Sequence, residues 1–265
     1  MDGLIAVPLG AVLGFLIGLT GVGGGALVAP SLYVILGLSY QEAIALSLIY
    51  SLFTKIVGAV QHIRQGTVLW KLTLLYGLTG IPGAVLGSHA IYRMGSATER
   101  VFPYVMAALL VTVAVLILLE TVVRNLAARE KPFSPHVLSP PGIAAIAAFQ
   151  LLVGVLLGIT SVGSGSLVIL SMLYLFRMTA QQIVGSNIVI ALIMVVPASL
   201  THFGLGGGST RLSLLMLLMA GSVVGTVLGA RTALRLPQWA LKLVIVVLIL
   251  AGAVATIVKA GRMAA

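Results

Sequence analysis

Residues 18–28, GLTGVGGGALV, return at a constant offset of 140 as residues 158–168, GITSVGSGSLV. Each stretch interrupts an apolar run, the first at 4–37 and the second at 142–176. A helix of that length would measure about 50 Å, well beyond the ~30 Å hydrocarbon core of a bilayer. Because glycine lets the backbone leave helical geometry, we expect each run to be a broken or re-entrant helix.

The composition around these stretches belongs to a membrane protein. Charged residues make up 8% of the 265 residues, apolar residues make up 60%, and the mean hydropathy is +1.21. A soluble domain carries about 25% charge. Further apolar runs at 42–62, 68–92, 101–123, 181–203, 210–235 and 237–259 are each about long enough to cross a bilayer as helix. The sequence predicts an all-α integral membrane protein.

Charge and cysteine content exclude several classes of function. The net charge is +10, but the 15 Lys and Arg residues are scattered near the ends of apolar runs, so we expect no nucleic-acid partner. Without cysteine there is no disulfide, thiolate metal site or cysteine nucleophile. No HExxH or GxSxG motif is present. We therefore expect no cofactor, no metal site and no catalytic residue.

The chain divides at the polar stretch 124–141 into residues 1–123 and residues 142–265, which resemble each other. At the same offset of 140, Gln41 falls on Gln181 and His62 on His202, and GAVLG at 83–87 matches GTVLG at 225–229 after a two-residue slip. Internal repeats of this kind are common in transporters. We expect two homologous repeats of about four helical segments, each opening with its broken helix.

The orientation of the two repeats depends on how the broken segments cross the membrane. If each is a re-entrant hairpin, the repeats are inverted and the two sides carry nine and five Lys or Arg; if each crosses once, the repeats are parallel and the counts are eight and six. The positive-inside rule favours inverted over parallel repeats. The loop 124–141 would then be cytoplasmic and both termini outside.

The Gly- and Ser-rich breaks are candidate anion sites. Backbone N–H groups freed at membrane depth need partners, and a loop that opens a helix presents them at its positive end. Two breaks in repeat-equivalent positions indicate a substrate site near the bilayer midplane. The alternative is close helix packing through small residues.

Lys55 lies deep in the run 42–62, where a cation costs at least ~2.5 kcal/mol and normally faces a cavity. We expect it to be a counter-charge for an anionic substrate; the alternative is a lysine that snorkels to the interface. His62 and His202 end the second helix of each half and are candidates for proton coupling or gating, or else for helix capping.

Polar groups on other apolar spans complete the candidate set, because they can donate hydrogen bonds to a substrate or join neighbouring helices. The predicted substrate-binding residues are Thr20, Gly21, Gly23, Gly24, Gly25, Ser47, Ser51, Lys55, Thr160, Ser161, Gly163, Ser164, Gly165, Ser166 and Asn187. A proton relay of buried carboxylates is not expected, because none of the five acids lies clearly in the middle of an apolar span. They are Asp2, Glu42, Glu99, Glu120 and Glu130.

From about residue 4 to residue 259 the chain resembles the sulfite exporter TauE/SafE family of permeases, through its two similar halves and the break GVGGGALVAP at 21–30. The resemblance implies outward movement of sulfite, organosulfonates or related oxyanions across a bacterial inner membrane. The second half departs from the pattern: Ser161 and Ser164 replace glycines, and Leu170 stands where Pro30 does. Equal roles for the two breaks are therefore in doubt.

These observations predict a secondary transporter of a small anion, moved by alternating access as one half rocks against the other. The resemblance implies that this anion is a sulfur-containing oxyanion such as sulfite or an organosulfonate. The expected partners are the small anionic substrate and the lipid bilayer, and self-association into a homo-oligomer stays open. The alternatives are an anion channel, an importer of another small anion, and an intramembrane enzyme that uses Ser-Lys chemistry at Lys55.

Overall fold

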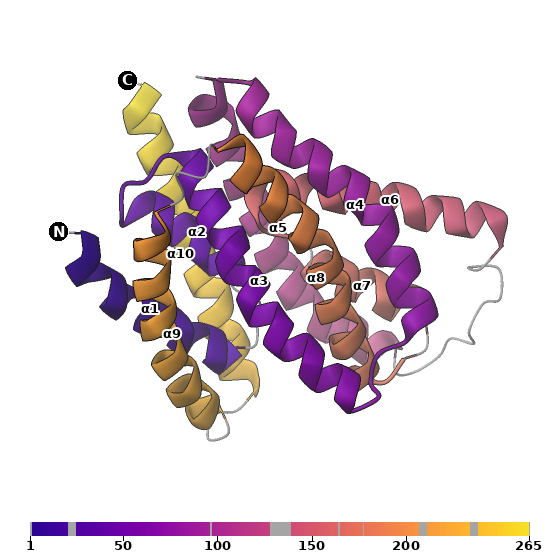
Figure 1. Cartoon of the computed structure of the whole chain (residues 1–265). Coiled ribbons are helices and arrows are strands. Elements are labelled where there is room, and N and C mark those ends of the chain that lie inside the picture. The colour runs from indigo at the N-terminus through magenta and orange to yellow at the C-terminus, as the bar shows by residue number, and fades with distance from the viewer. Residues whose placement is uncertain are drawn as a thin grey trace.

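The computed structural model describes residues 2–20, 25–95, 97–127, 139–163, 165–176, 178–206, 211–233 and 238–264. Within these ranges every regular element is a helix, and there are ten (Figure 1). Their bounds are α1 (Asp2–Thr20), α2 (Gly25–Val34), α3 (Tyr40–Arg64), α4 (Trp70–Arg93), α5 (Ala97–Ala127), α6 (Pro140–Thr160), α7 (Ser166–Leu175), α8 (Ala180–Leu205), α9 (Leu212–Ala233) and α10 (Gln238–Ala264).

Both overlong apolar runs are broken, as the sequence predicts. The run 4–37 forms α1 and α2, and the run 142–176 forms α6 and α7. Six of the described helices, α3, α4, α5, α6, α8 and α10, are long and apolar enough to cross a membrane, whereas α1, α2, α7 and α9 are shorter apolar helices. The remaining runs became helices within a few residues of the expected limits.

Capping boxes fix the starts of α3 and α8. Ser39 Oγ accepts a hydrogen bond from the Glu42 N–H at 3.3 Å, and the Glu42 carboxylate accepts one from the Ser39 N–H. Thr179 and Gln182 form the same reciprocal pair at the start of α8. Each box satisfies two N–H groups that the first turn leaves without partners. Both helices therefore begin at or just before the expected residue.

Helices α1 and α9 pack with their backbones in direct contact along what we call the α1–α9 seam. Three glycines of α1 face α9, one per turn: Gly10, Gly14 and Gly18. A Cβ at Gly14 would lie 2.3 Å from the Ser222 carbonyl oxygen, where no side chain fits. Glycines of α9 face α1 in return, and a Cβ at Gly225 would lie 2.0 Å from the Ala11 oxygen. Small residues at four-residue spacing give this contact in membranes.

Helices α4 and α6 form a second contact of the same kind, the α4–α6 seam. A Cβ at Gly83 would lie 2.0 Å from the Leu151 oxygen, and one at Gly154 would lie 2.2 Å from the Gly80 oxygen. In both seams the contacting residue numbers rise together, so the paired helices run parallel. Each seam joins a helix from the first half of the chain to one from the second half.

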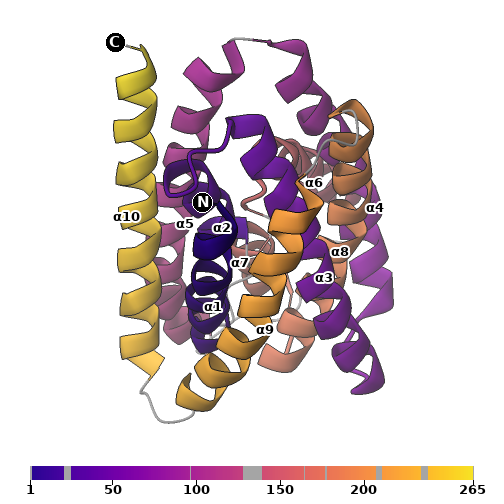
Figure 2. The same cartoon turned by 60° about the vertical axis from the view of Figure 1, so that its left-hand side comes forward.

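Two other helix pairs run antiparallel. In the first pair, Gly58 near the end of α3 lies against Ile188 near the start of α8. The second pair is α5 and α10. Near the start of α5, Glu99 accepts a hydrogen bond from the Tyr40 N–H. Lys259, near the end of α10, donates to carbonyls at positions 33 and 38, so the end of α10 lies beside the start of α5. Figure 2 shows α10 upright at one edge of the molecule, with α5 behind it.

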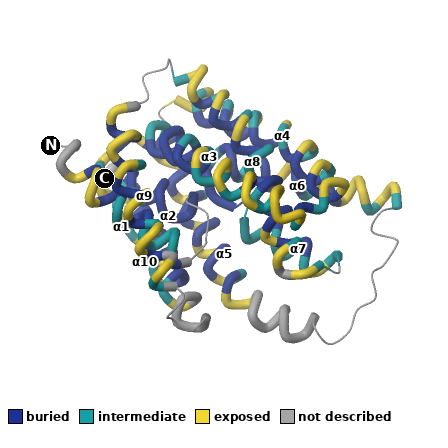
Figure 3. Tube along the Cα trace, turned by 60° about the horizontal axis from the view of Figure 1, so that its bottom comes forward, coloured by how far each residue is buried: buried dark blue, intermediate teal, exposed yellow. Residues whose placement is uncertain are grey.

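Buried residues lie on the inward faces of the helices, and exposed ones follow the outer faces (Figure 3). Many exposed side chains are large and apolar, such as Val57 at 72% and Leu200 at 67%. In water such a surface would be costly, but hydrocarbon solvates it. Four fully buried tyrosines, Tyr33, Tyr40, Tyr50 and Tyr76, lie inside.

Candidate functional site

The first residue of α2 lies directly against the second helix break. A Cβ built on Gly25 would stand 1.9 Å from the carbonyl oxygen of Ser161 and 3.4 Å from its Oγ. Only glycine permits this approach. The two regions that the sequence singled out in separate halves are therefore in contact at Gly25 and Ser161.

Backbone geometry turns the chain sharply at the second break. Ser161 has φ 60° and Gly163 has φ 105°, both in the left-handed region that few side chains tolerate. The Thr160 hydroxyl donates to the Leu156 carbonyl at 2.6 Å and accepts from the Val162 N–H at 3.1 Å. These bonds end α6 and hold the turn in the buried interior.

The start of α7 is open. A Cβ added at Gly165 would meet nothing within 4 Å, and this N-cap residue has no side chain to cap the first N–H groups of the helix. Ser166, its first residue, is half-buried. An uncapped helix N-terminus carries partial positive charge and donors suited to an anion.

Helix α3 brings a polar stripe to the second break. Ser47 Oγ and Ser161 Oγ share a hydrogen bond of 3.0 Å, and both residues are buried. Ser51 and Lys55 follow Ser47 at intervals of four, which places all three on one face of the helix. The stripe runs from the break toward the end of α3.

Lys55 points along this stripe toward the break. Its Nζ donates to Ser51 Oγ one turn earlier, and the residue is half-buried. Lys55 forms no ion pair with a carboxylate among the described residues. Its charge is therefore directed into the protein, rather than toward the interface at the end of α3.

Asn187, the repeat equivalent of Ser47, lies away from the second break. The next residue, Ile188, packs on Gly58. Gly58 lies eleven positions beyond Ser47 on α3, about 16 Å along the helix axis. Asn187 is nearly buried, and its Oδ1 accepts no hydrogen bond within the part of the chain that the structure describes.

The two histidines occupy different surroundings. His202 is 1% exposed; its Nε2 donates to the Gly158 carbonyl of α6 at 3.0 Å, and its Nδ1 lies 3.3 Å from the Tyr92 hydroxyl of α4. His62 is half-buried and bonds to Thr67 in the loop that follows α3, at 2.9 Å. His202 thus fastens α8 to the α4–α6 seam, whereas His62 makes a local loop contact.

Gly21, Gly23, Gly24 and Ser164 lie outside the described residues, as does the side chain of Thr20. Gly163 lies against Leu109 of α5. The structure thus brings together Gly25, Ser47, Ser51, Lys55, Thr160 and Ser161. Asn187 lies away from the second break, and His62 bonds within the loop that follows α3.

Two tyrosines that the sequence analysis did not single out hold α3 in place. The Tyr40 hydroxyl donates to the Ile159 carbonyl at 3.0 Å, next to the second break. The Tyr50 hydroxyl bonds to Ser222 of α9. Buried tyrosine hydroxyls normally need a hydrogen-bond partner. Tyrosines inside an apolar run of the sequence could therefore have indicated these contacts.

Four hydroxyl side chains of the site are buried in this structure. Ser47, Ser51, Thr160 and Ser161 are each less than 5% exposed. A hollow of about 430 Å³ lies among α4, α6 and α7, beside Tyr76 and Ser171, and a second lies between α2 and α10. Neither is lined by the residues of the site.

Comparison with known proteins identifies a family that this chain matches. The family model described as "Sulfite exporter TauE/SafE" matches residues 6–256. The chain belongs to this family. Membership of TauE/SafE, together with six helices suited to span a bilayer, makes it a multi-pass membrane transporter.

Individual relatives are described as probable membrane transporter proteins. The chain is 31% identical over 251 residues to the probable membrane transporter protein YjnA of Bacillus subtilis, covering 92% of this chain and 95% of YjnA. It is 24% identical to YdhB of the same organism, covering 90% and 92% of the two chains, and 24% identical to YunE, covering 87% and 88%. No solved structure matches the chain.

Proposed function

We propose that the chain is a secondary transporter that exports a small sulfur-containing oxyanion, such as sulfite or an organosulfonate, and binds it where α3 meets the second helix break. The observation that carries the proposal is the Ser47–Ser161 contact, which connects the break to a polar stripe ending in Lys55. Hydroxyl donors, helix N-termini and one ammonium are the groups that bind an oxyanion. The family match supports the class of substrate.

The ten helices form two inverted repeats, α1–α5 and α6–α10. The offset-140 sequence match supports this arrangement, as do the equivalent pairings of α1 with α9 and of α6 with α4. Equivalent helices α3 and α8 run antiparallel, as do α5 and α10. Inverted repeats give a transporter two related conformations, one open to each side.

The moving bodies each combine helices from both repeats. The α1–α9 seam holds α3 through the Tyr50–Ser222 bond, and the α4–α6 seam holds α8 through His202. A motion of one sequence half against the other would have to open both seams. Movement at the α3–α8 interface would have to open the Ser47–Ser161 and Tyr40–Ile159 bonds and the bond from Gln41 of α3 to the Ile91 carbonyl of α4.

Membrane potential is a sufficient driving force for export. An inside-negative potential contributes about 2.3 kcal/mol per charge per 100 mV to the outward movement of an anion. A transporter with Lys55 in its site needs no buried carboxylate relay to use this potential.

Flux of sulfite and small organosulfonates through proteoliposomes tests the proposal, with and without an imposed potential. We expect saturable, voltage-sensitive flux that falls at least tenfold in Lys55→Ala, because the counter-charge is lost. Lys71→Ala, which removes an exposed lysine at the start of α4, is the matched control and should keep its flux. Equal flux in the two variants would remove Lys55 from the site. Flux that never saturates would indicate a channel.

A further inference from the structure

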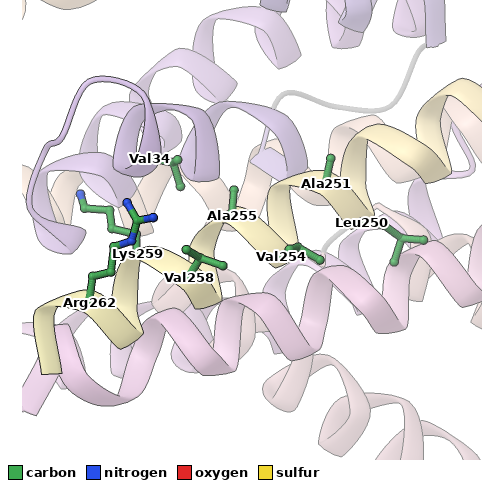
Figure 4. A pocket seen from close by; sticks show the side chains of 8 residues that line it. All are labelled: Val34, Leu250, Ala251, Val254, Ala255, Val258, Lys259 and Arg262. Carbon is green, nitrogen blue, oxygen red and sulfur yellow. The ribbon is translucent and has the colours of Figure 1, made fainter. Parts of the chain in front are cut away.

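A groove of about 630 Å³ lies between α2 and α10, and none of the residues of the site described above lines it. Its walls are Val34 of α2 and, along α10, Leu250, Ala251, Val254, Ala255 and Val258. Figure 4 shows these side chains following one another along α10. The groove is therefore apolar over most of its length.

Two cations close one end of this groove. Lys259 and Arg262 line it after Val258, and Figure 4 shows their nitrogen atoms gathered at the same end. Arg262 is exposed and makes no hydrogen bond or ion pair within the described part of the chain. Its guanidinium keeps all five donors, in the planar fork that matches a phosphate.

Lys259 adds a second positive charge at that end, and hydrogen bonds hold its ammonium group in place. Its Nζ donates to the carbonyl oxygens of Tyr33 and Leu38 and lies 3.8 Å from the centre of the Tyr33 ring. An ammonium has three donors, so one is left for a ligand. Glu99 attracts this ammonium electrostatically, which leaves Arg262 as the free cation of the pair.

The length of the groove fits one leaflet of a bilayer. From Leu250 to Arg262 the helix rises by about 18 Å, close to half of a ~30 Å hydrocarbon core. The cations lie in the last turns of α10, and the ends of a transmembrane helix reach the lipid headgroups. The apolar part then extends toward the middle of the membrane.

We propose that this groove is a binding site for an anionic phospholipid. One acyl chain lies along Val258, Ala255 and Ala251, and the headgroup phosphate is held by the Arg262 guanidinium and the remaining Lys259 donor. Basic pockets beside transmembrane helices bind anionic headgroups by this chemistry. The charge at one end and the leaflet-length apolar wall together favour a lipid over a second copy of the chain.

Native mass spectrometry of the purified full chain tests the site. The probes are phosphatidylglycerol and phosphatidylcholine with identical acyl chains, added in equal amounts. We expect phosphatidylglycerol to be retained at least tenfold more than phosphatidylcholine. Arg262→Gln should lower its retention to the phosphatidylcholine level, whereas Arg64→Gln, at the exposed end of α3, should leave it unchanged.

A second variant tests the apolar part. Ala255→Phe fills the groove without changing its charge and should reduce retention of both lipids. Size-exclusion elution of each variant as one peak establishes that it is folded, and Arg262→Gln changes only an exposed side chain. Equal retention of phosphatidylglycerol in Arg262→Gln and Arg64→Gln would overturn the proposal. So would binding of inorganic phosphate in place of lipid, or a dimer that Ala255→Phe dissociates.

Discussion

The two glycine seams and the α3–α8 interface are built in opposite ways. In the α1–α9 and α4–α6 seams the glycine backbones contact the partner's carbonyl groups, and an added Cβ would lie 2.0–2.4 Å from an oxygen. Between α3 and α8 the contact is made by side chains, and a Cβ added at Gly58 would lie 3.4 Å from Ile188, an ordinary separation.

This difference separates rigid from adjustable contacts. Backbones locked at glycines cannot slide or tilt without collision, since close-packed elements transmit strain. Side chains such as Ile188 can change rotamer and follow a small rotation. The seams therefore act as fixed units, and the α3–α8 interface is where a transporter of this shape can move.

Filling a seam is expected to have the largest effect. Gly14→Val places a side chain where the Ser222 carbonyl oxygen lies 2.3 Å from the Cβ position. We expect a loss of about 3 kcal/mol in the free energy of unfolding, from overpacking that flexible side chains cannot relieve. Denaturant unfolding in mild detergent, followed by circular dichroism, measures it. An unchanged unfolding midpoint would mean that the seam is not rigid.

Loss of His202 is expected to be the next largest effect, because this side chain fastens α8 to both helices of the α4–α6 seam. His202→Ala leaves a cavity and removes two hydrogen bonds, at a cost of about 2 kcal/mol in the free energy of unfolding. His62→Ala should cost less than about 1 kcal/mol, because its partner lies in a loop. The same unfolding assay compares them, and equal losses would contradict the assignment.

Locking the α3–α8 interface tests where movement occurs. The chain has no cysteine, so Gly58→Cys with Ile188→Cys introduces a single pair. We expect its oxidation, or a short bifunctional thiol reagent, to lower anion flux in proteoliposomes at least tenfold, with recovery after reversal. Each single variant, treated in the same way, is the control. Full flux in the cross-linked protein would place the motion elsewhere.

The smallest effect is expected for Gly58→Ala. The added methyl group meets Ile188 at 3.4 Å, and alanine is a better helix former than glycine by up to about 1 kcal/mol. We expect stability to stay unchanged or to rise slightly, by less than about 1 kcal/mol. The unfolding midpoint beside that of Gly14→Ala gives the test, since the same substitution should destabilise the seam.

Much of the fold could be predicted from composition and glycine placement, because lipid permits few structures other than helices. The breaks near Gly25 and Ser161 followed from the length of each segment and from the small residues that interrupt it. The two seams could not be predicted from the sequence, although Gly83 and Gly87 stood out there as part of a repeated motif. Glycines at four-residue spacing mark a packing face but do not name its partner, and α4 pairs with α6 from the other half.

The candidate site was predicted only in part for a related reason. Ser47 and Asn187 are equivalent in sequence, which suggested that they would face one site. Because α3 and α8 run antiparallel, equivalent residues lie at opposite ends of their interface unless they sit at the crossing point. Ser47 therefore contacts the second break, while Asn187 lies near the end of α3.

The pairing of α1 with α9 has a consequence for synthesis of the chain. About 200 residues separate the contacting glycines, so at ~5–20 residues per second the ribosome makes α9 some 10–40 seconds after α1. During that interval the glycine face of α1 has no native partner. For the α4–α6 seam only about 70 residues separate the contacting positions, so α6 follows α4 sooner. Helix α1 is thus among the last of the described helices to reach its native partner, and it depends on lipid or the insertion machinery during that interval.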